Sequence, residues 1–121
     1  MELEVDKKYI NKNRIKRVEI EYKDMNYIIA NLIEKVIDVN GEIREFSISD
    51  DKMLELENKI WEYENLDEFD YWPDKTKDHP PMAIMWRILW WEDDDTYHHK
   101  NGATKYPDNF MELINEFKEL K

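Results

Sequence analysis

Residues 86–99, WRILWWEDDDTYHH, contain the clearest strand pattern in this sequence. Side chains of a strand point alternately to its two faces, so one face would carry Ile84, Trp86, Ile88 and Trp90. The other face would carry Met85, Arg87, Leu89 and Trp91. Because both faces are mostly apolar, the pattern indicates a central strand that helices cover on at least one side. The first face is expected in the core, whereas the second fits either a core face or a partner surface, because an arginine interrupts it.

Four acids follow this strand, and a run of carboxylates is typical of a solvated turn. The turn would comprise Glu92, Asp93, Asp94 and Asp95. The chain would return as a strand over residues 96–100, and Asn101-Gly102 would end it, because these residue types favour turns. The stretch therefore predicts a β-hairpin with a strongly charged tip.

The first part of the chain predicts more strands. Val18, Ile20 and Tyr22 alternate with charged residues, which is the pattern of a half-buried strand. Residues 27–38, YIIANLIEKVID, fit a helix or a strand by their spacing, and their β-branched content favours a strand. Asn40-Gly41 then predicts a type I′ hairpin. Pairing across this hairpin would bring together on one face Ile33, Ile37, Phe46 and Ile48.

Two helices complete the predicted architecture. The first would be capped by Ser49 and Asp50 and would run to about Glu64, with an apolar stripe of Met53, Leu56, Ile60 and Tyr63. The second would follow Pro107, begin with Asp108 as its cap, and bury Phe110, Leu113, Ile114, Phe117 and Leu120. Together these elements predict an α+β fold: an antiparallel sheet of about five strands with two helices on one face, in the order β-β-β-α-β-β-α.

The length of 121 residues predicts a single domain over residues 1–121. Residues 1–13 are expected to form a flexible basic arm, and residues 65–81, which contain three prolines, a long loop with acids and aromatics. The beginning of the chain lacks the apolar segment of a secretory signal, and the apolar stretch at 82–91 is too short for a membrane-spanning helix. Since the chain also has no cysteine, we expect a cytoplasmic protein.

Charge is distributed unevenly along the chain, whose formal net charge is −11. Residues 1–23 carry seven bases and five acids, and residues 24–121 carry eleven bases and twenty-four acids, a balance of −13. Such a surface repels nucleic acid and anionic membranes and attracts basic proteins. The alternative interpretation is that the acidity serves only solubility, and the sequence does not decide between this and attraction of a basic partner.

The sequence offers no catalytic or cofactor-binding constellation. His98 and His99 would point to opposite faces of a strand, so both cannot easily bind one metal ion. Glu57-Asn58-Lys59 has the letters of a nuclease E-x-K motif, but these residues lie on a predicted helix and the motif needs a strand. The two glycines and two serines lack the motifs of a phosphate loop and of a serine nucleophile. We therefore expect a protein that is not an enzyme and that needs no metal or cofactor.

One segment resembles a known group of proteins. Trp86-Arg87-Ile88, followed by GATKYPDNFMEL at residues 102–113, is similar to a terminal hairpin and helix with the pattern W-x-[IL], then G-x-N-x-Y-P-x-x-[FW]-x-x-L. That pattern recurs in small acidic proteins of phages and mobile elements of Gram-positive bacteria, although Thr104 stands where it has asparagine. The resemblance implies a fold segment and, by association with that group, an anti-CRISPR or other anti-defence function.

The acids and aromatics predict a binding function. Carboxylates can pair with the arginines and lysines that DNA or RNA would contact, so the expected partner is a basic nucleic-acid-binding protein, above all a CRISPR-associated nuclease. An immunity protein or antitoxin that neutralises a basic toxin is the alternative, and no direct contact with nucleic acid or membranes is expected. Tyr71 and Trp72 would supply an apolar anchor. The predicted partner-binding residues are Asp67, Glu68, Asp70, Tyr71, Trp72, Asp74, Glu92, Asp93, Asp94 and Asp95.

Overall fold

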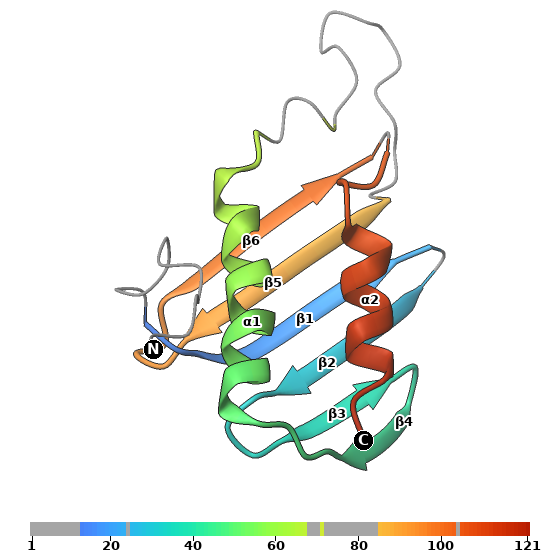
Figure 1. Ribbon diagram of the computed structural model, residues 1–121. Coiled ribbons are helices and arrows are strands. Elements are labelled where there is room, and N and C mark those ends of the chain that lie inside the picture. The colour runs from blue at the N-terminus through green and yellow to red at the C-terminus, as the bar shows by residue number, and fades with distance from the viewer. Residues whose placement is uncertain (1–12, 24, 68–70, 72–84, 104) are drawn as a thin grey trace, which may run out of the picture.

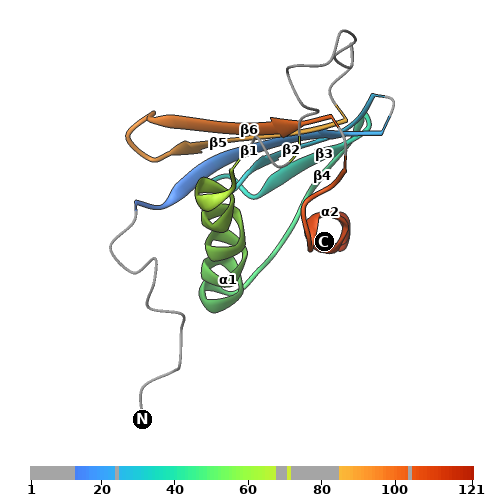
Figure 2. The ribbon, with the colours of Figure 1, turned by 90° about the horizontal axis from the view of Figure 1, so that it is seen from above.

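A computed structural model describes residues 13–23, 25–67, 71, 85–103 and 105–121. It contains one antiparallel sheet of six strands in the order β4-β3-β2-β1-β5-β6. Two helices, α1 (Asp50–Trp61) and α2 (Phe110–Lys118), lie on one face of this sheet, as Figure 1 and Figure 2 show. The predicted α+β class, with both helices on one face of an antiparallel sheet, is confirmed.

The strands follow the chain as β1 (Ile15–Tyr22), β2 (Asn26–Asn31), β3 (Val36–Val39), β4 (Glu42–Glu45), β5 (Trp86–Glu92) and β6 (Tyr97–Gly102). A short 3-10 helix, η2 (Glu62–Asn65), continues α1. The observed order is therefore β-β-β-β-α-β-β-α, with one strand more than the sequence predicted. β1 lies in the middle of the sheet, between β2 and β5.

The additional strand arises because residues 27–38 form two strands instead of one. Between these strands, the side-chain oxygen of Asn31 accepts hydrogen bonds from the backbone N–H groups of Ile33 (3.1 Å) and Glu34 (2.8 Å). Lys35 has a positive φ of 58°, which completes the reversal of the chain. Ile33 is consequently 66% exposed in the turn, and the prediction that it faces the core beside Phe46 is wrong.

The Asn40-Gly41 hairpin is confirmed. Both residues have positive φ values, 53° and 93°, as a type I′ turn requires, and they join β3 to β4. The register places Ile37 opposite Arg44. Ile37 and Phe46 are both buried in the core, as the pairing predicted.

β5 is the strand that the tryptophan-rich stretch predicted. Trp86, Ile88 and Trp90 are buried on its helix-covered face, and β5 pairs with β1 on one side and β6 on the other. β6 continues through Gly102 and does not end at Lys100. A Cβ atom at Gly102 would lie 2.6 Å from Nε1 of Trp86, so glycine is needed there for close packing and not for a turn.

Both helices begin near their predicted positions. α1 starts at Asp50, where Oγ of Ser49 accepts a backbone hydrogen bond from the first turn (3.2 Å). The predicted cap of the second helix is wrong, because α2 starts at Phe110 and its N-cap is Asn109, one residue after Asp108. Asn109 has a left-handed backbone with φ 66°, which asparagine tolerates better than most residues, and its side chain makes no capping hydrogen bond.

The core lies between the sheet and the two helices. The buried apolar residues of α1 are Met53, Leu56, Ile60 and Trp61, and those of α2 are Phe110, Leu113, Ile114 and Phe117. These stripes match the predicted helical spacing. Within the described part of the chain, neither helix is long and apolar enough to span a lipid bilayer.

Candidate partner-binding surface

The tip of the β5–β6 hairpin is the predicted acidic turn, residues 92–95. Asp95 adopts a left-handed backbone with φ 73°, and Oδ1 of Asp94 accepts a hydrogen bond from the N–H of Thr96 (3.0 Å). Hydrogen bonds from Thr96 stabilise the carboxylate and lower the pKa of Asp94 below its ordinary value. The backbone N–H of Glu92 also donates to the carbonyl of Thr96 (2.7 Å). The turn is therefore a hydrogen-bonded structure with exposed aspartates.

Glu92 differs from the three aspartates of the turn. Its side chain is 12% exposed, and its Oε2 lies 2.7 Å from Nε2 of His98. Its Oε1 accepts a hydrogen bond from Nδ2 of Asn13 (2.9 Å). Asp95, by contrast, pairs with Lys16 at the surface. The carboxylates of this turn that a partner could reach are therefore those of the aspartates.

The second predicted patch begins at the opposite end of the hairpin. Asp67 is exposed after η2, and Tyr71 is half-buried with its ring perpendicular to that of Trp86, at 5.5 Å between centroids. The Tyr71 carbonyl accepts a hydrogen bond from the N–H of Ala103 (2.8 Å). Tyr71 thus packs against the beginning of β5, and its role as a partner anchor stays a prediction. Outside the described residues lie Glu68, Asp70, Trp72 and Asp74.

The described residues of the two patches lie far apart. β5 runs from Trp86, beside Tyr71, to Glu92 in the acidic turn, and this length of strand spans roughly 20 Å. In Figure 1 the end of η2 lies toward the end of the hairpin that is opposite the β5–β6 turn. A partner that contacted both ends would have to extend along the hairpin.

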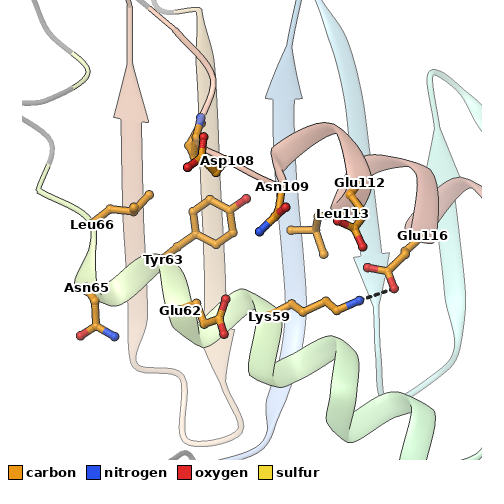
Figure 3. Close-up of a pocket in the computed structure, with 11 residues that line it drawn as sticks. Lys59, Glu62, Tyr63, Asn65, Leu66, Asp108, Asn109, Glu112, Leu113 and Glu116 are labelled. Atoms are coloured by element: carbon orange, nitrogen blue, oxygen red, sulfur yellow. Dashed lines mark hydrogen bonds and ion pairs between the residues drawn. The ribbon is translucent and has the colours of Figure 1, made fainter.

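A groove between the helices, which we call the acidic groove, gathers acids that the sequence did not single out. It lies where η2 faces the start of α2 and has a volume of about 380 Å³. Nζ of Lys59 lies 2.5 Å from Oε1 of Glu116 across it, and this hydrogen-bonded ion pair raises the pKa of Lys59 (Figure 3). The carboxylates that line the groove belong to Glu62, Asp108, Glu112 and Glu116.

No local pattern could have predicted this groove. Glu62 follows α1, whereas Asp108, Glu112 and Glu116 belong to the segment around α2, on the far side of β5 and β6 in the chain. Each of these acids, taken alone, is an ordinary charged residue of a solvated helix face. Asp108 and Glu112 also interact favourably with the partial positive charge at the start of α2. Only the packing of the two helices on the same face of the sheet brings them together.

The face of the sheet opposite the helices carries an aromatic row. Trp91, Tyr97 and His99 stack in succession, with centroid distances of 6.2 and 6.1 Å. The guanidinium carbon of Arg17 lies 5.7 Å from the ring centroid of Trp91, and Tyr97 is 57% exposed. Neither α1 nor α2 covers this face (Figure 2). Of the two interpretations that the sequence left for the Arg87 face, a core covered by these helices is therefore wrong.

The two adjacent histidines lie on opposite faces of the sheet, as the strand pattern predicted. His98 stacks on Trp90 at 5.1 Å and makes an edge contact with Trp61 at 5.2 Å on the helix side. His99 lies in the aromatic row on the other side. Across the described ranges, no three His, Asp or Glu side chains are placed to hold a metal ion. The absence of enzymatic activity stays a prediction.

No protein-family model, curated protein or solved structure matches this chain. The resemblance of residues 86–113 to proteins of phages and mobile elements therefore stays a prediction.

Proposed function

We propose that this protein is a non-enzymatic inhibitor that binds the basic, nucleic-acid-contacting surface of a partner protein. The observation that carries the proposal is the acidic turn, where Asp93, Asp94 and Asp95 stand exposed at the tip of a hairpin. Hydrogen bonds to Asp94 and Glu92 hold the turn in one conformation. A preformed turn loses little conformational entropy on binding, so its carboxylates can pair with arginine or lysine at low cost.

The charge of the helical layer supports the same proposal. Residues 49–67 and 105–121, which form the helices and their flanking segments, contain eleven acids and five bases, an excess of six negative charges. A field of this sign accelerates the encounter with a basic partner and disfavours nucleic acid as a ligand. The acidic turn and the helical layer would thus attract the same class of protein.

The partner class that we propose is a CRISPR-associated nuclease. Such an enzyme holds its nucleic acids in a positively charged channel. Carboxylates can pair with the arginines and lysines of that channel and so compete with phosphate groups. The resemblance of residues 86–113 to proteins of phages and mobile elements favours this class over other basic proteins. A basic toxin is the alternative partner, and the same acidic surface would bind it.

Affinity capture followed by competition tests the proposal. The immobilised protein would be exposed to a lysate of a Gram-positive bacterium that encodes a CRISPR nuclease, and the captured proteins would be identified by mass spectrometry. We expect a nucleic-acid-binding protein that a DNA duplex or the nuclease's guide RNA displaces. Capture of a dedicated toxin would point to an immunity protein, and a partner that nucleic acid fails to displace would argue against the proposed mode of binding.

A further inference from the structure

Tyr63 places a polar group in the wall of the acidic groove. Its ring packs in the core against Trp86 and Phe110, at 6.4 Å between centroids in each case, and the residue is only 6% exposed. Figure 3 shows its hydroxyl directed toward the start of α2, at the groove that Tyr63 lines. Among the described residues, none forms a hydrogen bond with this hydroxyl. Burial raises the pKa of Tyr63, so the hydroxyl keeps its proton at neutral pH and can donate or accept.

Glu116 offers a second unused polar atom in the same groove. Lys59 pairs with Oε1 of this carboxylate, whereas Oε2 is buried and has no hydrogen-bond partner. A buried carboxylate oxygen without a donor is energetically costly. The Glu116 side chain is 37% exposed as a whole, so a rotation of its carboxylate would present Oε2 to a ligand in the groove, whose hydrogen bond would recover that cost.

We infer that the acidic groove binds the guanidinium group of an arginine side chain from a protein partner. Four carboxylates and one ammonium line the groove, which leaves a formal excess of three negative charges. Leu66 and Leu113 line the same space and can contact the aliphatic stem of an arginine. A guanidinium presents five N–H donors in one plane, enough to reach carboxylates on both walls and the Tyr63 hydroxyl together.

Other cations fit the groove less well. A divalent metal needs several converging oxygen ligands, and the residues that the structure describes form no such group. A lysine ammonium is compact and strongly hydrated, so it gains less than a guanidinium from a groove with apolar walls. The inference rests on the proposed function for its claim that the cation belongs to a protein partner. Binding of a guanidinium to the groove does not depend on that claim.

A small probe tests the groove by itself. N-acetyl-L-arginine amide carries the guanidinium as its only charge, and N-acetyl-L-citrulline amide is its uncharged counterpart of nearly the same shape. In nitrogen-15 NMR spectra we expect the arginine probe to shift the amide signals of residues 62–66 and 108–116 in a saturable manner. The citrulline probe should leave these signals in place. Shifts of equal size in the acidic turn, or with the citrulline probe, would overturn the inference.

Three variants sharpen the test. Glu112→Gln and Tyr63→Phe alter the groove, and Glu119→Gln removes the same charge from an exposed position of the α2 segment outside it. Glu112→Gln should weaken binding of the arginine probe about threefold to tenfold and Tyr63→Phe about twofold to fivefold, while Glu119→Gln binds as the parent does. Equal losses in the Glu112 and Glu119 variants would mean that net charge alone attracts the probe, and the inference would fall.

The probe and the capture experiment can fail separately. If the groove binds the arginine probe and no basic protein is captured, guanidinium binding by the groove is supported and the proposed function is contradicted. If a basic partner is captured in a charge-dependent manner and the probe shifts no groove signal, the function stands and this inference is wrong.

Discussion

Arg14 and Glu57 form a bidentate ion pair that fastens the start of β1 to α1. Nε of Arg14 donates to both carboxylate oxygens at 3.0 Å, and its Nη2 donates to Oε2 at 2.8 Å. Glu57 is 3% exposed, and the backbone N–H of Ile15 also donates to it at 2.7 Å. Glu57 is the acid of the E-x-K letters noted in the sequence. Its carboxylate is therefore engaged in hydrogen bonds that join a strand to a helix.

Replacing Arg14 should destabilise the fold. Arg14→Met leaves the Glu57 carboxylate buried with the Ile15 N–H as its remaining donor, which should lower the free energy of unfolding by about 1–3 kcal/mol in urea titrations. Glu57→Gln keeps an oxygen for Ile15 and removes the charge. Arg14→Met should therefore cost less in a Glu57→Gln background than in the parent, and equal costs in both backgrounds would show that the two side chains are not coupled.

Gly102 should tolerate no side chain. A Cβ atom at this position would lie 2.6 Å from Nε1 of Trp86 and 2.6 Å from Cβ of Tyr71. Gly102→Ala should consequently lower the free energy of unfolding by about 1–3 kcal/mol, because two packed aromatic residues must move. His99→Ala, at an exposed position of the same strand, is the control and should change stability by about 0.5 kcal/mol or less. A Gly102→Ala protein as stable as this control would disprove the close packing.

The hairpins and helix stripes could be predicted from the sequence because each depends on neighbours in the chain. A run that is mostly apolar on both faces predicts β5, and Asn40-Gly41 predicts the turn between β3 and β4 because these residue types tolerate the positive φ values that the structure shows. The break after β2 could not be recognised in the same way. Asn31 reverses the chain through its side chain, whereas the surrounding apolar residues keep a strand-like composition that predicts one continuous strand.

The candidate site could be predicted only where its residues are consecutive. The aspartates of the acidic turn form one run, and the structure leaves them exposed. Glu92 belongs to the same run, but its carboxylate is engaged by His98 on the neighbouring strand of the hairpin and by Asn13. Asn13 is far away in the chain, so its approach cannot be recognised in the sequence. Glu62 and Glu116 line the same acidic groove, but only tertiary packing places their segments together, so no local pattern predicts it.

Because of Tyr63, the free energy of unfolding should fall as the pH rises above about 10. Burial raises its pKa in the folded protein from an ordinary value of 10.0. Above that pH the unfolded chain releases the Tyr63 proton while the folded protein keeps it, so the unfolded state binds fewer protons and stability falls as the pH rises. Tyr63→Phe should remove this part of the loss in urea titrations at about pH 8 and about pH 11. Parallel declines in the variant and the parent would assign the whole effect to other groups.

The acidic turn can be neutralised without disturbing its structure. Replacing Asp93, Asp94 and Asp95 together with Asn keeps a side-chain oxygen for the N–H of Thr96, and asparagine tolerates the left-handed backbone of residue 95. Glu92 stays unchanged because its carboxylate is engaged inside the hairpin. The melting temperature of this triple turn variant should remain within about 2 °C of the parent value, since the lost ion pair with Lys16 is at the surface.

A matched control removes the same charge elsewhere. Glu42, Glu45 and Glu119 are exposed around the β4 edge of the sheet, at the other side of the molecule from β6. Arg44 of β4 donates to the carbonyl of Leu120, which places the end of the chain at this edge. Changing these three glutamates to Gln gives an edge control with the net charge of the triple turn variant.

The association rate with the captured partner, measured by surface plasmon resonance at low and high salt, shows directly whether the acidic turn contacts that partner. At low salt the triple turn variant should associate about threefold to tenfold more slowly than the parent and depend less on salt, because the turn would steer the encounter. The edge control should associate nearly as fast as the parent. If the triple turn variant binds as rapidly and as tightly as the parent, the proposed role of the acidic turn is wrong. The acidity of the turn would then serve solvation, and the aromatic row of Trp91, Tyr97 and His99 would become the surface to test.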